Sequence, residues 1–351
     1  MPVNDRELVS FVVPVFNAIQ RLPIVFEALV MAYQPRGQDR GNFEVIFVDD
    51  KSTDGSHDLL WLYANAVPWI SLITCDQNLG PGEARNRGLK ISRGLFVSFL
   101  DVDDAFDPAV FLRAAEATMR AELPCGAVSY VVVPQGTTFP GMHVFPVEPD
   151  AEVVKDSASI KRVDTYRELL DYAAVWRFVF RREFLNNLHL TFPQTRYGED
   201  LLFLLKVAAF SGETLVYAEI GYIHYLSEGA SARSATLSER VALSRALMDV
   251  LVEARISRLP AGTVRELDAL ILAWQVRIIS RLPVSTPDKL HQLITIYRLA
   301  PPPVSMEAVR FCDVALNLAS VGRGAGHRTF HRIARRLESV RLGGPRHGLG
   351  S

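Results

Sequence analysis

The sequence contains little cysteine and carries almost no net charge. Its three cysteines are odd in number and far apart, so they fit neither a disulfide framework nor a metal-binding knuckle. We therefore expect reduced, packed thiols and a cytoplasmic protein. The formal net charge of −1 over 351 residues does not suit a chain that wraps nucleic acid, so any electrostatic function must be local.

Long hydrophobic runs are also missing. No window approaches the roughly 18 uninterrupted apolar residues that a spanning helix needs, and MPVNDRELVS at the N-terminus lacks the pattern of a signal peptide. We expect any membrane contact to be at the surface. Hydrophobic residues still make up 49% of the chain, enough for a large core and, by length, for two domains.

Two common nucleotide-binding signatures do not occur. The sequence has neither the GxxxxGK[ST] of a P-loop nor the GxGxxG of a dinucleotide-binding turn. Their absence removes most of the support for an ATPase or a dinucleotide-dependent oxidoreductase.

The first hundred residues alternate between short apolar runs and stretches with helical periodicity. Runs rich in β-branched and aromatic residues predict buried strands, at residues 8–13, 43–48, 69–73 and 95–100. Amphipathic stretches predict helices between them, at residues 19–33, 56–64 and 82–91. This alternation predicts an α/β, Rossmann-like fold with a mostly parallel sheet flanked by helices.

The rest of the chain changes character near residues 232–236. Before that boundary we expect a helix that starts at the Asp107 cap and runs to about Ala121, a strand leading into a short helix at 175–185, a helix within 197–210, and two short strands at 214–217 and 222–226. Beyond it, helical periodicity predicts an all-helical domain. We thus expect two domains, 1–233 and 236–351.

Ligands of such sheets bind outside the carboxyl ends of the strands. The segments that follow the four predicted strands are rich in polar residues: PVFN at 14–17, DDKSTDGS at 49–56, CDQNLGPGEARN at 75–86 and DVDD at 101–104. These four segments are the candidate functional site.

The DVDD segment crowds Asp101, Asp103 and Asp104 into four positions. Like charges this close raise one another's pKa, so a bound cation would offset the cost. Carboxylates one residue apart at a strand end suit Mg²⁺ or Mn²⁺ together with the phosphate oxygens of a substrate. The alternative is an acidic turn entering the next helix, for which Asp104 and Asp107 suffice.

The two middle segments suit a nucleoside diphosphate. Asp49 and Asp50 can accept hydrogen bonds from ribose hydroxyls or a base N–H, although Ser, Thr, Asp and Gly are also ordinary turn formers. In NLGPGEARN, Gly80 opens a helix that carries Arg85 in its first turn. Backbone N–H groups and a guanidinium at a helix start favour an anion such as a diphosphate.

Together the four segments resemble the family 2 glycosyltransferases of the GT-A fold. In that family PVYN is followed by VDDGSTDGS, by N-x-G-x-x-x-ARN and by a metal-binding DXD motif, usually written DSDD. Phe16, Lys51 and Val102 depart from the usual Tyr, Gly and Ser, and none removes a group that the mechanism needs. The resemblance continues through VWRFVFRREFL and YGEDLLFLLK, which look like the family's W-x-x-x-F-R and ED segments, and ends near residue 233.

The resemblance implies a site for a nucleotide-sugar, most often a UDP-sugar, and for Mn²⁺ or Mg²⁺. Asp103 and Asp101 would hold the metal; His224 would be a third ligand, with plain packing as its alternative role. The residues implied in nucleotide-sugar binding are Pro14, Phe16, Asn17, Asp49, Asp50, Asn78, Gly80, Arg85, Asn86, Asp101, Val102, Ser231 and Arg233.

The resemblance also implies an inverting single displacement, in which an acceptor hydroxyl attacks C1 of the sugar as the nucleoside diphosphate leaves. Such a step needs a base for the hydroxyl and positive charge for the leaving group. Asp200 of the ED pair is the candidate base, and Glu199 is the alternative. Without a catalytic role, both would be acids favoured by the dipole at a helix start.

The QxxRW motif of processive family members does not occur. We therefore expect addition of single sugars to a hydroxyl of a glycan, a cell-envelope polysaccharide or a lipid-linked acceptor. An inactive GT-A-like binding or assembly module is the alternative, which the presence of Asp101, Asp103 and Asp200 disfavours. A nucleotidyltransferase would need a Gly-rich loop ending in Arg near the first strand, and PVFNAIQRLP has none.

The C-terminal tail is basic. Residues 322–351 hold seven arginines and three histidines against one acid, Glu338. A basic amphipathic helix here suits an anionic membrane at its inner face or a polyanionic acceptor, and a packed terminal helix is the alternative. The helical domain is also a candidate surface for homo-oligomer formation.

Overall fold

The computed structural model describes residues 8–33, 43–134, 160–165, 168–169, 173–195 and 197–226, together with four isolated positions after residue 238. The chain divides into two units, residues 1–234 and 235–351, and the description here concerns the first. Apart from those four positions, the predicted all-helical domain lies outside the described residues, and so do its basic tail, Ser231 and Arg233.

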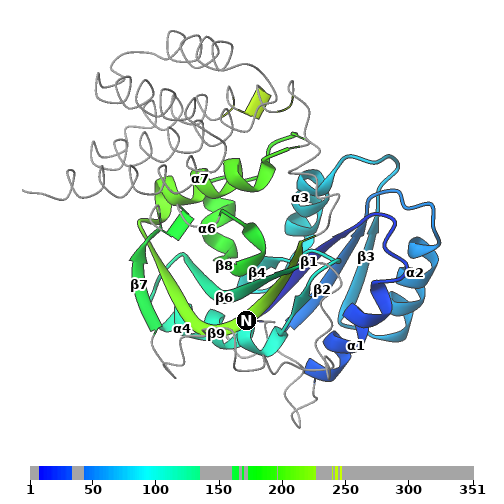
Figure 1. Cartoon of the computed structure of the whole chain (residues 1–351), viewed down its shortest axis with the longest axis horizontal. Helices are drawn as coiled ribbons and strands as arrows, with labels where there is room; N and C mark the ends of the chain where they lie inside the picture. The colour runs from blue at the N-terminus through cyan, green and yellow to red at the C-terminus, as the bar shows by residue number, and fades with distance from the viewer. Residues whose placement is uncertain are drawn as a thin grey trace, which may run out of the picture. The chain divides into compact units, whose positions relative to one another are not determined.

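One mixed sheet organises the first unit (Figure 1). In the described part of the chain its strands are β1 Val9–Val15, β2 Phe43–Asp49, β3 Ile70–Thr74, β4 Phe96–Phe99, β5 Ala105–Phe106, β6 Cys125–Pro134, β7 Ile160–Asp164, β8 Phe178–Arg181 and β9 Glu213–Leu226. Their order is β3-β2-β1-β4-β8-β6-β9-β5, and β7 pairs with β9. Strands β3, β2, β1 and β4 run parallel, and parallel and antiparallel pairs mix beyond β4.

Three of the parallel strands, β1, β2 and β4, are buried as their sequences predict, whereas in the edge strand β3 only Ile70 is buried. All of β2 is buried, and in β1 only Pro14 is partly exposed. Near-continuous apolar strands are required where helices cover both faces of a parallel sheet. The predicted α/β class, with a mostly parallel sheet flanked by helices, is confirmed.

Helices cover both faces of this sheet (Figure 1). They are α1 Leu22–Ala32, α2 Ser56–Ala66, α3 Pro81–Ile91, α4 Pro108–Arg120, α6 Arg182–Asn187 and α7 Glu199–Ser211, with a short 3-10 turn, η2, at Val175–Arg177. Helices α1, α2 and α4 share one core cluster with the Phe11 face of β1. On the opposite face, Phe99 of β4 contacts Phe203 of α7 at 5.9 Å between ring centroids.

Helix α3 lies close against the sheet because it carries glycine at the contact. A Cβ at Gly88 would lie 2.3 Å from Cγ1 of Val12 on β1. Val12 pairs in register with Phe99, so α3 and α7 lie on the same face of the sheet. This arrangement brings the start of α3 near the start of α7.

Strand β9 corrects one prediction. We predicted two strands, at 214–217 and 222–226, but residues Glu213–Leu226 form a single strand. Its partner β6 shifts register, pairing Val128 with Tyr217 but Ser129 with Ile220. The two residues between them bulge out while the strand continues, and in sequence such a bulge looks like a turn.

The expectations about the cysteines and about membrane-spanning helices can also be compared with the structure. Cys75 and Cys125 are buried and carry free thiols, as expected, while Cys312 lies outside the described residues. Among the helices that the structure describes, none has the length and apolarity needed to cross a bilayer.

Candidate active site

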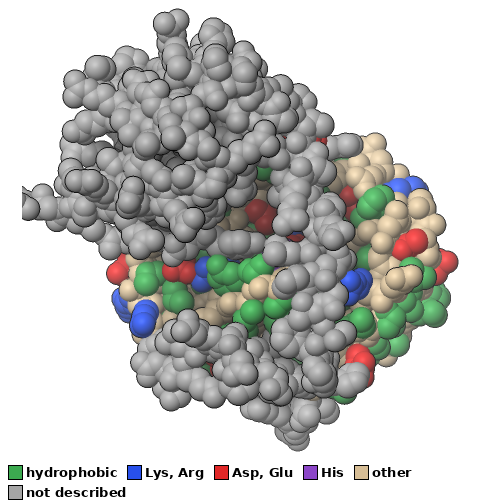
Figure 2. Space-filling model, viewed as in Figure 1, with side chains coloured by type: hydrophobic (Ala, Val, Ile, Leu, Met, Phe, Trp, Pro, Cys, Tyr) green, Lys and Arg blue, Asp and Glu red, His purple; other side chains and the backbone are tan. Residues whose placement is uncertain are grey.

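The four polar segments follow the four parallel strands, so they lie along one edge of the sheet. Backbone hydrogen bonds tie them together at that edge: Asp50 N–H donates to Val15 O at 2.8 Å, and Cys75 N–H donates to Asp49 O at 2.8 Å. Next to them Leu100 N–H donates to Val12 O at 3.0 Å, just before the DVDD turn. Acidic side chains are visible near the middle of the face in Figure 2.

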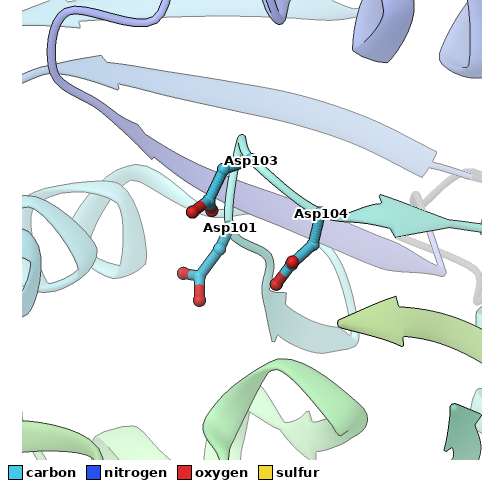
Figure 3. A group of neighbouring side chains, drawn as sticks. All are labelled: Asp101, Asp103 and Asp104. Atoms are coloured by element: carbon cyan, nitrogen blue, oxygen red, sulfur yellow. The ribbon is translucent and has the colours of Figure 1, made fainter. Parts of the chain in front are cut away.

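The DVDD turn gathers three carboxylates at the end of β4. Carboxylate oxygens of Asp101, Asp103 and Asp104 lie within 4.8 Å of one another. Figure 3 shows all three side chains projecting from one tight turn, with those of Asp101 and Asp103 next to each other. Val102, between them, is partly buried and packs against the core cluster of the α1 face.

Asp104 differs from its two neighbours because its oxygens are already engaged. It is buried and accepts hydrogen bonds from Tyr222 Oη at 2.7 Å, from Tyr225 N–H at 2.9 Å and at 3.0 Å from the Nδ1 position of His224. The interpretation that Asp104 steers the chain into the next helix is therefore wrong. Only Asp107 does so, accepting from Ala109 N–H at 2.9 Å as the N-cap of α4.

The hydrogen bond to Asp104 orients His224. The imidazole is stacked on Trp176, with 5.4 Å between ring centroids. Although desolvation lowers the pKa of His224, its hydrogen bond with Asp104 and the charge of that carboxylate raise it overall. Because Nδ1 is directed at Asp104, a metal-binding role for this side chain would fall to Nε2.

Crowding has a clear electrostatic effect on Asp103. Desolvation and the charges of Asp101 and Asp104 raise its pKa to about 6. Desolvation is the largest cause of this raised pKa, and the two neighbouring carboxylates add to it by repelling the ionised form. A divalent cation would relieve this repulsion.

A buried arginine connects the DVDD turn to the ED pair. Arg85 of α3 donates from Nη2 to Asp101 at 2.7 Å and from Nη1 to Asp200 at 2.6 Å and Glu199 at 3.3 Å. Its side chain is 3% exposed, and its guanidinium lies over the ring of Phe192 at 5.3 Å. The structure thus brings together three of the predicted carboxylates around one cation.

Close packing of α3 against α7 makes this bridge possible. A Cβ added at Gly82, in the first turn of α3, would lie 3.3 Å from Glu199 Cγ. The side chain of Asn86, one turn along α3, accepts from Phe192 N–H at 2.8 Å and donates from Nδ2 to Phe192 O at 2.9 Å. Asn86 therefore fixes the segment before α7, and nothing in this geometry supports a direct ligand contact for it.

Burial sets the protonation behaviour of Asp200. Desolvation raises its pKa to about 7, although Arg85 and a backbone hydrogen bond from Val175 act to lower it. The neighbouring charges of Glu199 and Asp101 push the pKa upward. A carboxylate with a pKa near 7 suits a general base at neutral pH.

Asp50 organises the loop before α3. Its carboxylate is buried and accepts from Leu79 N–H at 2.8 Å and Gly80 N–H at 2.7 Å. Asn78 Nδ2 donates to the Asp50 backbone oxygen at 3.3 Å, and Gly80 has a φ of 87°. These bonds place Gly80 at the start of α3, the helix that carries Arg85.

The end of β1 leaves one aromatic side chain exposed. Phe16 is 50% exposed, whereas the preceding Pro14 is partly buried within the strand. Asn17 has a φ of 50° and accepts from Thr53 N–H at 2.8 Å. An exposed ring beside a rigid turn is the kind of surface on which a nucleobase can stack.

Asp49 is more deeply buried than a ligand contact requires. It is 1% exposed, accepts from Ser52 N–H at 3.0 Å and is paired with His57 at 3.3 Å. The turn-forming interpretation explains these contacts, and the nucleotide-binding role of Asp49 stays a prediction.

Sequence reasoning missed the part played by Tyr222. Its hydroxyl donates to Asp104 and accepts from Asp101 N–H at 3.3 Å, so it holds both ends of the acidic turn. Tyr222 and His224 alternate along β9, a spacing that puts both side chains on one face of a strand. This two-residue spacing from His224 was the sequence signal that could have identified Tyr222.

Comparison with known proteins identifies the family of this chain. The glycosyl transferase family 2 model matches residues 10–188, just over half of the chain, and the chain belongs to that family. The succinoglycan biosynthesis protein ExoO of Rhizobium meliloti is 29% identical over 228 residues, which cover 64% of this chain and 62% of that protein. The chain thus spans less than two thirds of that relative.

Solved structures share the fold at lower identity. S. aureus TarS 1–349 in complex with UDP-GlcNAc superposes with a TM-score of 0.66 at 20% identity, covering 94% of this chain and 92% of that one. A Pyrobaculum calidifontis mannosyltransferase in complex with GDP-Man and Mn²⁺ superposes with a TM-score of 0.52 at 18% identity, covering 95% and 87%. The fold is therefore that of GT-A glycosyltransferases.

Proposed function

We propose that the protein is an inverting glycosyltransferase that moves a single sugar from a nucleotide-sugar to an acceptor hydroxyl. The observation that carries this proposal is the bridge through Arg85, which joins a carboxylate of the DXD turn, Asp101, to the candidate base, Asp200. A donor site and a base are the two parts that such a displacement needs. An inactive binding module is not favoured, because it would have no use for a partly buried carboxylate with a pKa near 7.

Asp101 and Asp103 fit a divalent cation. Their hard oxygen donors suit Mn²⁺ or Mg²⁺, and Mg²⁺ usually takes only one or two protein carboxylates beside phosphate oxygens. Asp104 is committed to Tyr222, Tyr225 and His224, so it supports the turn. A cation held there would supply positive charge beside a departing diphosphate.

The chain's own residues would divide the remaining work. Asp200, as the base, would take the proton of the acceptor hydroxyl as its oxygen attacks C1 of the sugar. The exposed ring of Phe16 would stack on the nucleobase. Asn17, which accepts from Thr53 N–H, would fix the backbone beside that ring. Asp50 and Gly80 would act by placing the start of α3.

A UDP-sugar is the first donor to test, because TarS was solved in complex with UDP-GlcNAc. We propose a glycan, cell-envelope polysaccharide or lipid-linked acceptor, since ExoO is a succinoglycan biosynthesis protein. The expectations of a cytoplasmic location, of a homo-oligomer through the helical domain and of membrane contact through the basic tail stay predictions.

A panel of UDP-sugars and GDP-mannose tests the proposal directly. With Mn²⁺ present, the correct donor should raise the melting temperature, because ligand that binds only the native state stabilises it. The same donor should release its nucleoside diphosphate when an acceptor is added. Stabilisation by no donor of the panel, with or without Mn²⁺, would contradict the proposal.

The rate of transfer should fall as the pH drops below about 7. Asp200 must be deprotonated to act as a base, and its pKa is raised from 3.8 to about 7, so the active form is lost on the acid side. The measurement is kcat between pH 5.5 and 9 at saturating donor and Mn²⁺, with UDP binding followed at each pH as the control. A kcat that stays constant down to pH 5.5 would exclude Asp200 as the base.

A further inference from the structure

Arg85 contacts carboxylates on both sides of the site. Asp101 follows β4, Asp200 and Glu199 begin α7, and Arg85 itself comes from α3. Three acids around one guanidinium leave the cluster with net negative charge. Removing the arginine would therefore leave three partly buried carboxylates without a compensating charge.

The geometry argues against a diphosphate contact for Arg85, the role suggested by its sequence position. Both terminal nitrogens already donate to carboxylates, at 2.6 and 2.7 Å to Asp200 and Asp101. Its Nε is buried and has no hydrogen-bond partner among the residues that the structure describes. The side chain is 3% exposed. Its N–H groups are therefore not open to the solvent from which a nucleotide-sugar would arrive.

We propose that Arg85 is a positioning residue that fixes the Asp200 carboxylate relative to Asp101. The inference rests on the proposed function only in giving Asp200 the role of base. A planar guanidinium suits this task because Nη1 and Nη2 point along separate, fixed directions. One side chain can thus hold two carboxylates from different elements, which a lysine ammonium cannot do with the same geometry.

Three variants test this role. Arg85→Met removes the charge and both hydrogen bonds, and Arg85→Lys keeps the charge but not the two-pronged geometry. Arg113→Met is the matched control, because Arg113 forms an arginine ion pair with Glu219 on an exposed surface, 44% and 46% exposed. If Arg85→Met does not fold, Arg85→Lys carries the test by itself.

Kinetics should separate positioning from binding. In Arg85→Met, kcat should fall by about 100-fold or more, because displacing a catalytic group by about 1 Å can cost that much. The KM of the donor and the binding of UDP with Mn²⁺ should change by less than about threefold. Arg85→Lys should recover part of kcat, and Arg113→Met should match the wild type.

A second measurement needs no turnover. The carboxyl carbon of Asp200, assigned by its loss in Asp200→Asn, can be titrated by NMR in aspartate-labelled protein. Asp200 faces Arg85, Glu199, Asp101 and the Val175 backbone, and Arg85 is the cation among them. Its apparent pKa should therefore rise in Arg85→Met and stay near the wild-type value in Arg85→Lys.

Two results would overturn the inference. One is an unchanged Asp200 titration in a folded Arg85→Met variant; the other is lost UDP binding with kcat preserved at saturating donor, which would make Arg85 a ligand contact. A shifted titration in a protein whose wild type turns over no donor would support the positioning role and contradict the proposed function.

Discussion

Replacing Asp200 by asparagine is expected to abolish sugar transfer while nucleotide-sugar binding survives. Asparagine keeps the shape of the side chain and an oxygen that accepts from Arg85, but it cannot take a proton. Loss of a general base lowers the rate by roughly 10²–10⁴-fold, so kcat should fall by a factor in that range. The melting-temperature rise with UDP and Mn²⁺ should match that of the wild type.

Glu199→Gln is the matched variant. Glu199 also contacts Arg85, at 3.3 Å, and begins the same helix, so it controls for the loss of one negative charge beside the arginine. It should retain most of the activity. Near-normal turnover in Asp200→Asn together with a large loss in Glu199→Gln would transfer the role of base to Glu199.

The second large effect is expected at Asp103. In Asp103→Asn, the Mn²⁺-dependent stabilisation by UDP should disappear, and turnover should fall by about 100-fold or more because charge stabilisation of the leaving group is lost. Both follow from the removal of one of the two carboxylates available to a cation. Calorimetric titration of Mn²⁺ in the presence of UDP measures the first effect directly.

In the absence of metal, Asp103→Asn should be no less stable to unfolding than the wild type. The pKa of Asp103 is raised from 3.8 to about 6 in the folded state, so the folded protein binds this proton more tightly than the unfolded chain. Stability is therefore lost as the pH rises from about 4 to 6, and the repulsion is complete at pH 8. Asparagine removes that repulsion.

Asp107→Asn provides the control on the same loop. Asp107 caps α4, and asparagine caps helices about as well as aspartate, so this variant should keep both stability and activity. A lower melting temperature of metal-free Asp103→Asn at pH 8, or Mn²⁺-dependent UDP binding in that variant, would contradict the proposed metal site.

The edge of the sheet where the site lies could be predicted from the sequence. Continuous apolar runs require strands buried on both faces, and right-handed crossovers between parallel strands place the segments after them on one edge. Asp101 and Asp103 were assigned in this way, and the family followed from the four motifs. Boundaries shifted by one to three residues: β1 extends to Val15, and α1 begins at Leu22 instead of Ile19.

The partners of these side chains could not be predicted in the same way. Asp104 looked like a turn residue, yet it is held by Tyr222 and His224 of a strand more than a hundred residues later. Arg85 looked like an anion-binding residue at a helix start, yet it lies between Asp101 and Asp200.

The sequence by itself determined the alternation of strands and helices, the edge at which the site forms and the acids that occupy it, because these depend on local periodicity and chain order. Only the tertiary structure decided which acid faces which partner. That choice depends on helices α3 and α7 covering the same face of the sheet and on β5 pairing with β9. Periodicity shows that a face is buried, but it does not show what covers that face.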